Sequence, residues 1–148
     1  MRLVVQRARE ASVCVDGKIC GQIRSGLVVL VGVHSQDAMH DVEFCADKCA
    51  HLRVFNDEEG RMNLSLLETG GAMLAISQFT LYGDCRKGRR PSYHDAAAPE
   101  PAQQLYESFM QRVEGHGIHV ERGVFGAHMQ VQLDNDGPVT LIVESPQK

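Results

Sequence analysis

The sequence predicts a single α/β domain with a strongly bent, mostly antiparallel, β-barrel-like sheet and two main helices. Hydrophobic residues recur with a period of two near both ends of the chain, and with a helical period in two segments between them. No linker, repeat or low-complexity stretch divides the 148 residues. A chain of this length buries about 68–70% of its unfolded surface. We therefore expect residues 1–148 to fold as one unit.

The first half of the chain predicts strands at Met1–Val15 and Ile19–Val33, and a shorter buried strand at Ala72–Ile76. Asp16-Gly17 separates the first two, and such a dipeptide is typical of a tight β-hairpin turn. The two long segments are thus expected to pair.

The first helix is predicted over Ala38–Leu52, where apolar residues form one stripe at helical spacing. Cys45 and Cys49 belong to this stripe. Their spacing of four would also suit two metal ligands, but buried cysteine behaves as a small hydrophobic residue, and the stripe favours the core. None of the seven histidines has the spacing of a zinc signature. We expect no metal and no cofactor.

The second helix follows two prolines, Pro99 and Pro101, which suit its first turn. Gly115 or Gly117 suits its end. Between them, apolar residues recur at i, i+3, i+4, i+7, i+8 and i+11; they are Ala102, Leu105, Tyr106, Phe109, Met110 and Val113.

Composition points to a cytoplasmic protein. Five cysteines without a secretory signal indicate a reducing compartment, and no run approaches the ~20 apolar residues of a membrane span. The formal net charge of −4 argues against broad nonspecific binding of nucleic acid.

Near the C-terminus, the six residues Asn135–Thr140 interrupt what otherwise has the pattern of two strands, Ala127–Asp134 and Val139–Glu144. Pro138 cannot donate to a central ladder, so it belongs at a strand start, an edge or a turn. An ordinary hairpin turn is one interpretation. The other is a cis Gly137-Pro138 bond, whose two carbonyl oxygens would point in nearly the same direction.

A polar segment, Ser77–Leu81, follows the buried strand without a conventional turn signal. At i and i+2 of a strand, Gln78 and Thr80 would present an amide and a hydroxyl on one face. Thr80 is also a residue type that ordinary strands favour.

Together these segments resemble the D-aminoacyl-tRNA deacylases, also called D-tyrosyl-tRNA deacylases. The resemblance covers essentially all 148 residues in order, and departs from the family mainly at Tyr82-Gly83 and in the cysteine-rich helix. The matching segments are Gln6–Ala8, Ala11–Val13, Gly26–Val33, Arg53–Phe55, Gly60–Leu64, Ser77–Leu81, Arg90–Ser92, Phe125–Met129 and Asn135–Thr140.

The resemblance implies a homodimer with active sites at the interface, and a substrate in which an amino acid is esterified to the 3′-terminal ribose of tRNA. It places catalysis at Ser77, Gln78, Phe79 and Thr80. Gly137-Pro138, held by Arg7, would reach the partner's site, receive the substrate ammonium group and exclude an L side chain.

The resemblance also implies that Phe125 and Met129 pack against the terminal adenosine. Met129 fits an ordinary inward strand position as well. Because glycine has no side chain to exclude, glycyl-tRNA is expected to be a substrate beside D-aminoacyl-tRNA.

A cationic loop follows the polar segment and contains Arg86, Lys87, Arg89 and Arg90. A solvated loop is the usual interpretation of such a run. Its position beside the expected site favours contact with tRNA phosphates.

No Ser-His-Asp or Cys-His arrangement can be recognised in the sequence. Two mechanisms of ester hydrolysis therefore remain. Thr80 as nucleophile needs a base, and the sequence shows none. Alternatively, the ribose 2′-hydroxyl helps to activate water while the N–H groups of Phe79 and Thr80 stabilise the oxyanion. The missing base favours the second mechanism.

Two rival function classes remain. One is a noncatalytic RNA- or DNA-binding protein that uses the cationic loop. The other is an esterase with Thr80 or Cys85 as covalent nucleophile. The pairing of Ser77–Leu81 with Gly137-Pro138 favours the deacylase.

Overall fold

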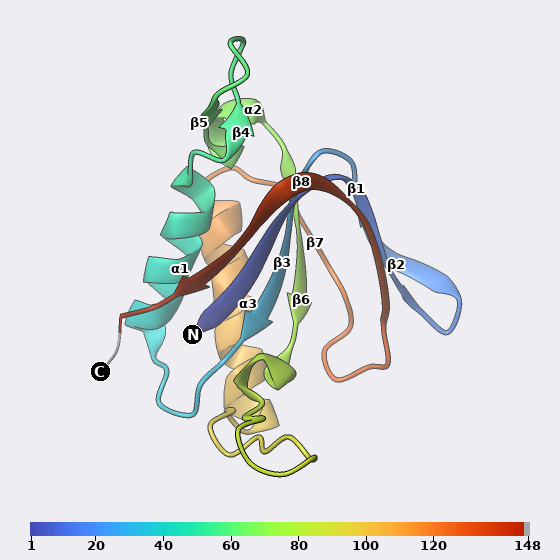
Figure 1. Cartoon of the computed structure of the whole chain (residues 1–148), viewed down its shortest axis with the longest axis vertical. Coiled ribbons are helices and arrows are strands. Elements are labelled where there is room, and N and C mark those ends of the chain that lie inside the picture. The colour runs from blue at the N-terminus through green and yellow to red at the C-terminus, as the bar shows by residue number, and fades with distance from the viewer. Residues whose placement is uncertain (147–148) are drawn as a thin grey trace.

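The sheet is organised around β1 (Arg2–Val15), which pairs along most of its length on both sides. The structure is a computed structural model that describes residues 1–146. β2 (Lys18–Ile23) and β3 (Gly26–Gly32) lie antiparallel to the second and first halves of β1. β8 (Gln130–Glu144) also pairs antiparallel with β1 (Figure 1).

β2 and β3 are two halves of the predicted strand Ile19–Val33, interrupted by a bend at Arg24-Ser25. The pairs Ala11↔Ile23 and Ala8↔Gly26 keep one register across the bend. At the other end of β2, Asp16 and Gly17 both have positive φ, 51° and 77°, as a two-residue hairpin turn requires. The predicted long hairpin is confirmed, with a bend that was not predicted.

Two short strands complete a nearly closed, barrel-like sheet. β6 (Ala72–Ser77) lies parallel to β3, and β7 (Val120–Arg122) lies parallel to β6. The bend brings β2 back toward β7, where a Cβ on Gly21 would lie only 2.7 Å from the carbonyl oxygen of Arg122. Glycine at position 21 therefore permits the close approach that nearly closes the barrel.

The helices cover the outer face of this sheet. α1 (Met39–His51) and α3 (Pro99–Gly115) match the two predicted helices closely. In Figure 1 they stand together on one side of the sheet. Apolar residues of both helices join Leu3, Val29 and Met73 of the sheet in the main core.

Cys45 and Cys49 lie fully buried in that core, as predicted. Burial raises the pKa of Cys45 to about 12 and raises that of Cys49 as well, so both remain neutral thiols.

A second apolar cluster fills the inside of the barrel. It uses the strand positions that alternate with those of the main core, because successive side chains of a strand point to opposite faces. On β6, for example, Met73 and Ala75 face the helices, while Leu74 and Ile76 face the interior.

A small two-stranded sheet and a short helix follow α1. The strands are β4 (Phe55–Asn56) and β5 (Met62–Leu64), and the helix is α2 (Leu66–Thr69). Ser65 and Glu68 form a capping box that begins α2. In Figure 1 this hairpin projects beside the arch of β8, at the opposite end of the molecule from the polar segment after β6.

The prediction that Asn135–Thr140 separates two strands is wrong. β8 runs continuously from Gln130, three residues later than predicted, to Glu144. Gln6 pairs with Thr140 and Ala8 with Asn135, so β8 carries several extra residues opposite a short stretch of β1. The extra residues form a bulge, Asp136–Val139, rather than a hairpin turn. The Gly137-Pro138 bond within it is cis, as the second interpretation expected.

Candidate active site

The polar segment begins where β6 ends. Ser77 is the last residue of β6, and the N–H of Gln78 donates to the carbonyl oxygen of Val31 in β3 at 2.8 Å. A 3-10 helix, η1 (Phe79–Tyr82), then turns the chain out of the sheet. The side-chain amide of Gln78 donates to the hydroxyl of Thr80. The predicted amide–hydroxyl pair is confirmed, although Thr80 lies in a helical turn rather than in a strand.

Phe125 and Met129 approach the same end of β6. The Phe125 ring lies 6.1 Å from that of Tyr106, whose hydroxyl donates to the carbonyl oxygen of Ala75 at 2.7 Å. Met129 is half-buried against the interior cluster that contains Ile76. Both predicted adenosine-binding residues are therefore linked to the end of β6, Ala75 and Ile76, which leads into Ser77–Thr80.

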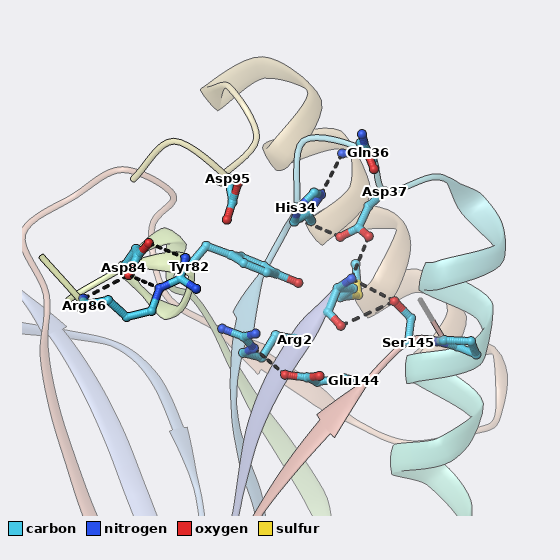
Figure 2. Close-up of a pocket in the computed structure, with 13 residues that line it drawn as sticks. Arg2, His34, Gln36, Asp37, Tyr82, Asp84, Arg86, Asp95, Glu144 and Ser145 are labelled. Carbon is cyan, nitrogen blue, oxygen red and sulfur yellow. Dashed lines mark hydrogen bonds and ion pairs between the residues drawn. The ribbon is translucent and has the colours of Figure 1, made fainter. Parts of the chain in front are cut away.

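Arg2 lies beside Tyr82, the last residue of η1, as Figure 2 shows. Its Nη1 donates to the carbonyl oxygen of Leu81 at 2.8 Å, and its guanidinium lies 4.7 Å from the centre of the Tyr82 ring. Nε forms an ion pair of 2.6 Å with Glu144 at the end of β8. Sequence reasoning missed Arg2, because its partners lie 79 and 142 residues away.

A cavity of about 520 Å³ lies behind this contact, lined in part by Arg2, His34, Tyr82 and Asp95. Burial raises the pKa of Tyr82, so its phenol stays neutral beside Arg2. Of the predicted site residues, only Arg86 borders the cavity. Ion pairs in the lining join Arg2 to Glu144, Arg86 to Asp84 and the N-terminal ammonium of Met1 to Asp37.

The cationic loop is closed by two backbone hydrogen bonds between Asp84 and Ser92, at 2.7 and 2.9 Å. Arg86 binds Asp84 through Nε and Nη2, and these bonds lower the pKa of the Asp84 carboxyl to about 2. Lys87, Arg89 and Arg90 are exposed. Most of the predicted phosphate-binding charge therefore faces solvent, while Arg86 also orders the loop.

Arg7 holds the bulge of β8, as the resemblance implied. It is only 5% exposed. Its Nε lies 3.1 Å from both the carbonyl oxygen and a carboxylate oxygen of Asp136, and its Nη1 donates to Val54 (2.6 Å) and Asn56 (3.3 Å).

Asn135 closes the bulge from the other side. Its amide donates to the carbonyl oxygens of Arg7 and Val139 at 2.9 and 3.2 Å. Gly137 and Pro138 themselves are exposed. The contacts of Val54, Asn56 and Asn135 were not predicted, and no local pattern in the sequence signals them.

Within one chain, the bulge and η1 lie apart. The bulge contacts β1 at Arg7 and η1 contacts it at Arg2, five residues earlier, which corresponds to about 17 Å along a strand. The structure thus places Phe125 and Met129 at the end of β6 that leads into Ser77–Thr80, whereas Gly137-Pro138 of the same chain lies elsewhere.

Neither a metal centre nor a membrane span is found in the part of the chain that the structure describes. No three His, Cys, Asp or Glu side chains of residues 1–146 are grouped to hold a metal ion. Over the same residues, no helix has the length and apolar character needed to cross a bilayer.

Comparison with known proteins identifies the family. Residues 4–144 match the family model described as D-Tyr-tRNA(Tyr) deacylase. The chain is 59% identical over 145 residues to a D-aminoacyl-tRNA deacylase of Fervidobacterium nodosum, covering 98% of this chain and 97% of that one. It is 57% identical over 148 residues to that of Thermus aquaticus, covering 100% and 97%.

Two solved structures share the fold. One, titled c-Myc DNA Unwinding Element Binding Protein, has a TM-score of 0.93 and 38% identity, and covers 99% of this chain and 100% of that one. Another, titled as a probable eukaryotic D-amino acid tRNA deacylase, has a TM-score of 0.85 and 19% identity, with 97% and 98% covered.

These matches place the chain among the hydrolases that act on ester bonds. Within that class, the chain belongs to the D-aminoacyl-tRNA deacylase family, and its activity is the deacylation of D-aminoacyl-tRNA.

Proposed function

We propose that the chain releases D-amino acids, and also glycine mischarged onto noncognate tRNA, while sparing L-aminoacyl-tRNA. The reaction would take place at Ser77–Thr80 of one subunit, and selection at Gly137-Pro138 of the partner subunit. The observation that carries the proposal is the exposed bulge, which the buried Arg7 holds away from η1 of its own chain. Such a chiral check would act as proofreading in translation, in the cytoplasm.

A homodimer is supported by the surface of β8. Among residues 1–146, this strand pairs with β1 alone, so its other edge has no strand partner. Leu141 and Ile142, next to the bulge, are 39% and 68% exposed. An open strand edge with exposed apolar side chains favours association with a second copy. That association would bring the bulge to another subunit's η1.

In the proposed reaction, water attacks the ester carbonyl carbon and the ribose 3′-oxygen leaves. The backbone N–H groups of Phe79 and Thr80 stabilise the oxyanion. Among residues 1–146, the hydrogen bond recorded for the Thr80 hydroxyl comes from the Gln78 amide, and this N–H cannot accept a proton, so it cannot serve as a base. The substrate 2′-hydroxyl therefore helps to activate the water, while Ser77 and Gln78 shape the pocket.

Selection in this proposal works by exclusion. The carbonyl oxygens of Gly137 and Pro138 receive the substrate ammonium group and leave no space for an L side chain. A D side chain points elsewhere, and glycine has none, so both are accepted. Arg7 fixes the bulge, because its guanidinium joins Asp136 to Val54 and Asn56.

Phe125 and Met129 would hold the terminal adenosine, since unpaired RNA ends are recognised by stacking and shape. The exposed cations Lys87, Arg89 and Arg90, with Arg86 ordering the loop, would contact phosphates of the acceptor end. Their contribution should weaken as salt concentration rises.

The direct test compares D-tyrosyl-tRNA with L-tyrosyl-tRNA on the same tRNA, following ester loss with time. We expect rapid loss of the D ester only, from an enzyme that elutes as a dimer. Equal hydrolysis of both esters would contradict selection, and a fully selective monomer would contradict the shared site.

A noncatalytic DNA-binding role is the second candidate, favoured by the similarity at 38% identity to the c-Myc DNA Unwinding Element Binding Protein. The net charge of −4 and the confinement of dense positive charge to one loop weigh against it. A competition assay with duplex DNA separates the two: a deacylase should lose little activity at DNA concentrations far above the tRNA concentration.

A further inference from the structure

Two exposed aromatic side chains meet beside the candidate active site. Phe79, at the start of η1, is 54% exposed, and Tyr93 is 40% exposed. Their ring centres lie 5.1 Å apart at an interplanar angle of 67°. The chain has only five phenylalanines, three tyrosines and no tryptophan. Two of these eight rings are therefore placed together where water reaches them.

Tyr93 is held in place rather than free to swing. A Cβ on Gly83 would lie 3.1 Å from Cε1 of Tyr93, so the ring rests against the backbone just after η1. The backbone hydrogen bonds between Asp84 and Ser92 close the loop immediately before Tyr93. The edge-to-face contact with Phe79 then orients the ring.

The charges around this pair suit a nucleic acid strand. Gln78 and Thr80 flank Phe79 along the chain, and the loop with the exposed cations Lys87, Arg89 and Arg90 leads directly into Tyr93. Aromatic rings beside a cationic track are the arrangement by which proteins bind unpaired nucleotides, because any base can stack while the backbone phosphates meet the cations.

We propose that Phe79 and Tyr93 form a stacking platform for the unpaired base that precedes the terminal adenosine of the RNA acceptor end. This inference rests on the proposed function. The terminal adenosine would bind at Phe125 and Met129, so the nucleotide before it must lie on another surface outside that pocket. The platform supplies that surface between the reaction segment and the phosphate-binding loop.

The test shortens the substrate one nucleotide at a time. D-alanyl esters of adenosine, of the dinucleotide CpA and of full tRNA are hydrolysed by wild type and by Tyr93→Ala. Alanine is chosen as the esterified amino acid because its methyl side chain cannot stack on the platform. We expect Tyr93→Ala to raise KM about tenfold for CpA and for tRNA. KM for the adenosine ester and kcat for all three substrates should not change.

Two matched variants sharpen the result. Tyr93→Phe keeps the ring and should restore KM, which separates stacking from a role of the hydroxyl. Ile19→Ala removes an exposed apolar side chain (58% exposed) from the distant β1–β2 hairpin and should change nothing. An equal rise in KM for the adenosine ester and for CpA would overturn the platform, and so would no change with any substrate.

A binding measurement tests the platform independently of the proposed deacylase function. Uncharged CpA should bind wild type about tenfold more tightly than adenosine by calorimetry, and Tyr93→Ala should abolish the difference. A wild-type enzyme that binds in this way but hydrolyses no D-alanyl ester would contradict the function and retain the platform. If Tyr93→Ala instead dissociates the dimer, the pair is an interface between copies and the proposal is wrong.

Discussion

Two exposed segments lie against the same strand and are held in different ways. The polar segment at η1 is held by Arg2, whose ion pair with Glu144 is 36% and 46% exposed at its two side chains. The bulge of β8 is held by Arg7, whose side chain is 7% exposed and joins Asp136, Val54 and Asn56. Both arginines belong to β1.

Arg7 is more buried than Arg2, and this difference matches the tasks proposed for the two segments that they hold. A segment that selects by steric exclusion must resist displacement by the wrong substrate, and buried charge-assisted hydrogen bonds provide that resistance. A segment that supplies backbone N–H groups needs correct placement, which neighbouring strands already give it through Gln78. We therefore expect changes at the two segments to affect different kinetic quantities.

The largest effect should come from the substrate rather than from a side chain. If the 2′-hydroxyl helps to activate water, D-aminoacyl-tRNA with a 2′-deoxy terminal ribose should be hydrolysed at least about a hundredfold more slowly. Thr80→Ala should retain much of the activity on normal substrate. Single-turnover rates of the four combinations check this. A severe loss in Thr80→Ala together with normal turnover of the deoxy substrate would instead support a threonine nucleophile.

Arg7→Ala should mainly damage selection and stability. Removing the guanidinium leaves the carbonyl oxygen of Val54 without this buried donor and frees the bulge. We expect the free energy of unfolding to fall by about 2–4 kcal/mol. The ratio of D to L hydrolysis should fall at least about tenfold. Urea denaturation and paired D and L assays measure the two effects.

Two controls belong to that experiment. Arg9→Ala removes an exposed arginine from the same strand and should alter neither quantity. Arg2→Ala should lower kcat a few-fold and cost less than about 1 kcal/mol, because its ion pair is exposed. A loss of selectivity in Arg2→Ala as large as in Arg7→Ala would remove the distinction between the two segments.

Gly137→Ala tests what the tip of the bulge faces. A Cβ there would lie 3.5 Å from Oδ1 of Asn135, an ordinary contact, so the chain should fold with nearly unchanged stability. In the proposed dimer the new methyl group would enter the substrate pocket of the partner. We expect kcat/KM for D-alanyl-tRNA to fall about tenfold or more. Unchanged kinetics would show that this position faces no substrate.

The smallest effect concerns an ion pair remote from both segments. Hydrogen bonds from Arg112 and His116 lower the pKa of Asp47 from 3.8 to about 2. Because the folded pKa lies below the unfolded one, this contribution is complete above about pH 4 and is lost as pH falls through about 2. Asp47→Asn should cost less than about 1 kcal/mol at pH 6, since the side chain is 41% exposed. The difference in the free energy of unfolding should shrink steadily as pH falls from 4 toward 2, with D/L selectivity unchanged at pH 7.

The sequence predicted the periodic elements and missed the irregular ones. Both helices and the Asp16-Gly17 hairpin follow from local patterns, and they were found. The bulge in β8 was mistaken for a break between strands, because only the remote pairs Gln6↔Thr140 and Ala8↔Asn135 show that one strand continues. The bend at Arg24-Ser25 likewise depends on where β2 meets β7.

In the candidate site, too, features that depend on remote contacts were not predicted. Gln78 and Thr80 were paired correctly, although a 3-10 helix and not a strand brings them together. The supporting residues Arg2, Asn56 and Tyr93 were missed, since each acts through a partner on another element. Local sequence carries residue types, whereas these roles arise from tertiary contacts.

The central claim is that the bulge rejects L substrates by steric exclusion alone. Glycyl-, L-alanyl- and D-alanyl-tRNA should be deacylated side by side at equal enzyme concentration. Since a single methylene-scale contact contributes only about 1–3 kcal/mol, a positive contact to the D side chain cannot separate glycine strongly from D-alanine. The account predicts loss of the glycyl and D-alanyl esters and survival of the L-alanyl ester. Survival of glycyl-tRNA to the same extent as L-alanyl-tRNA would contradict it.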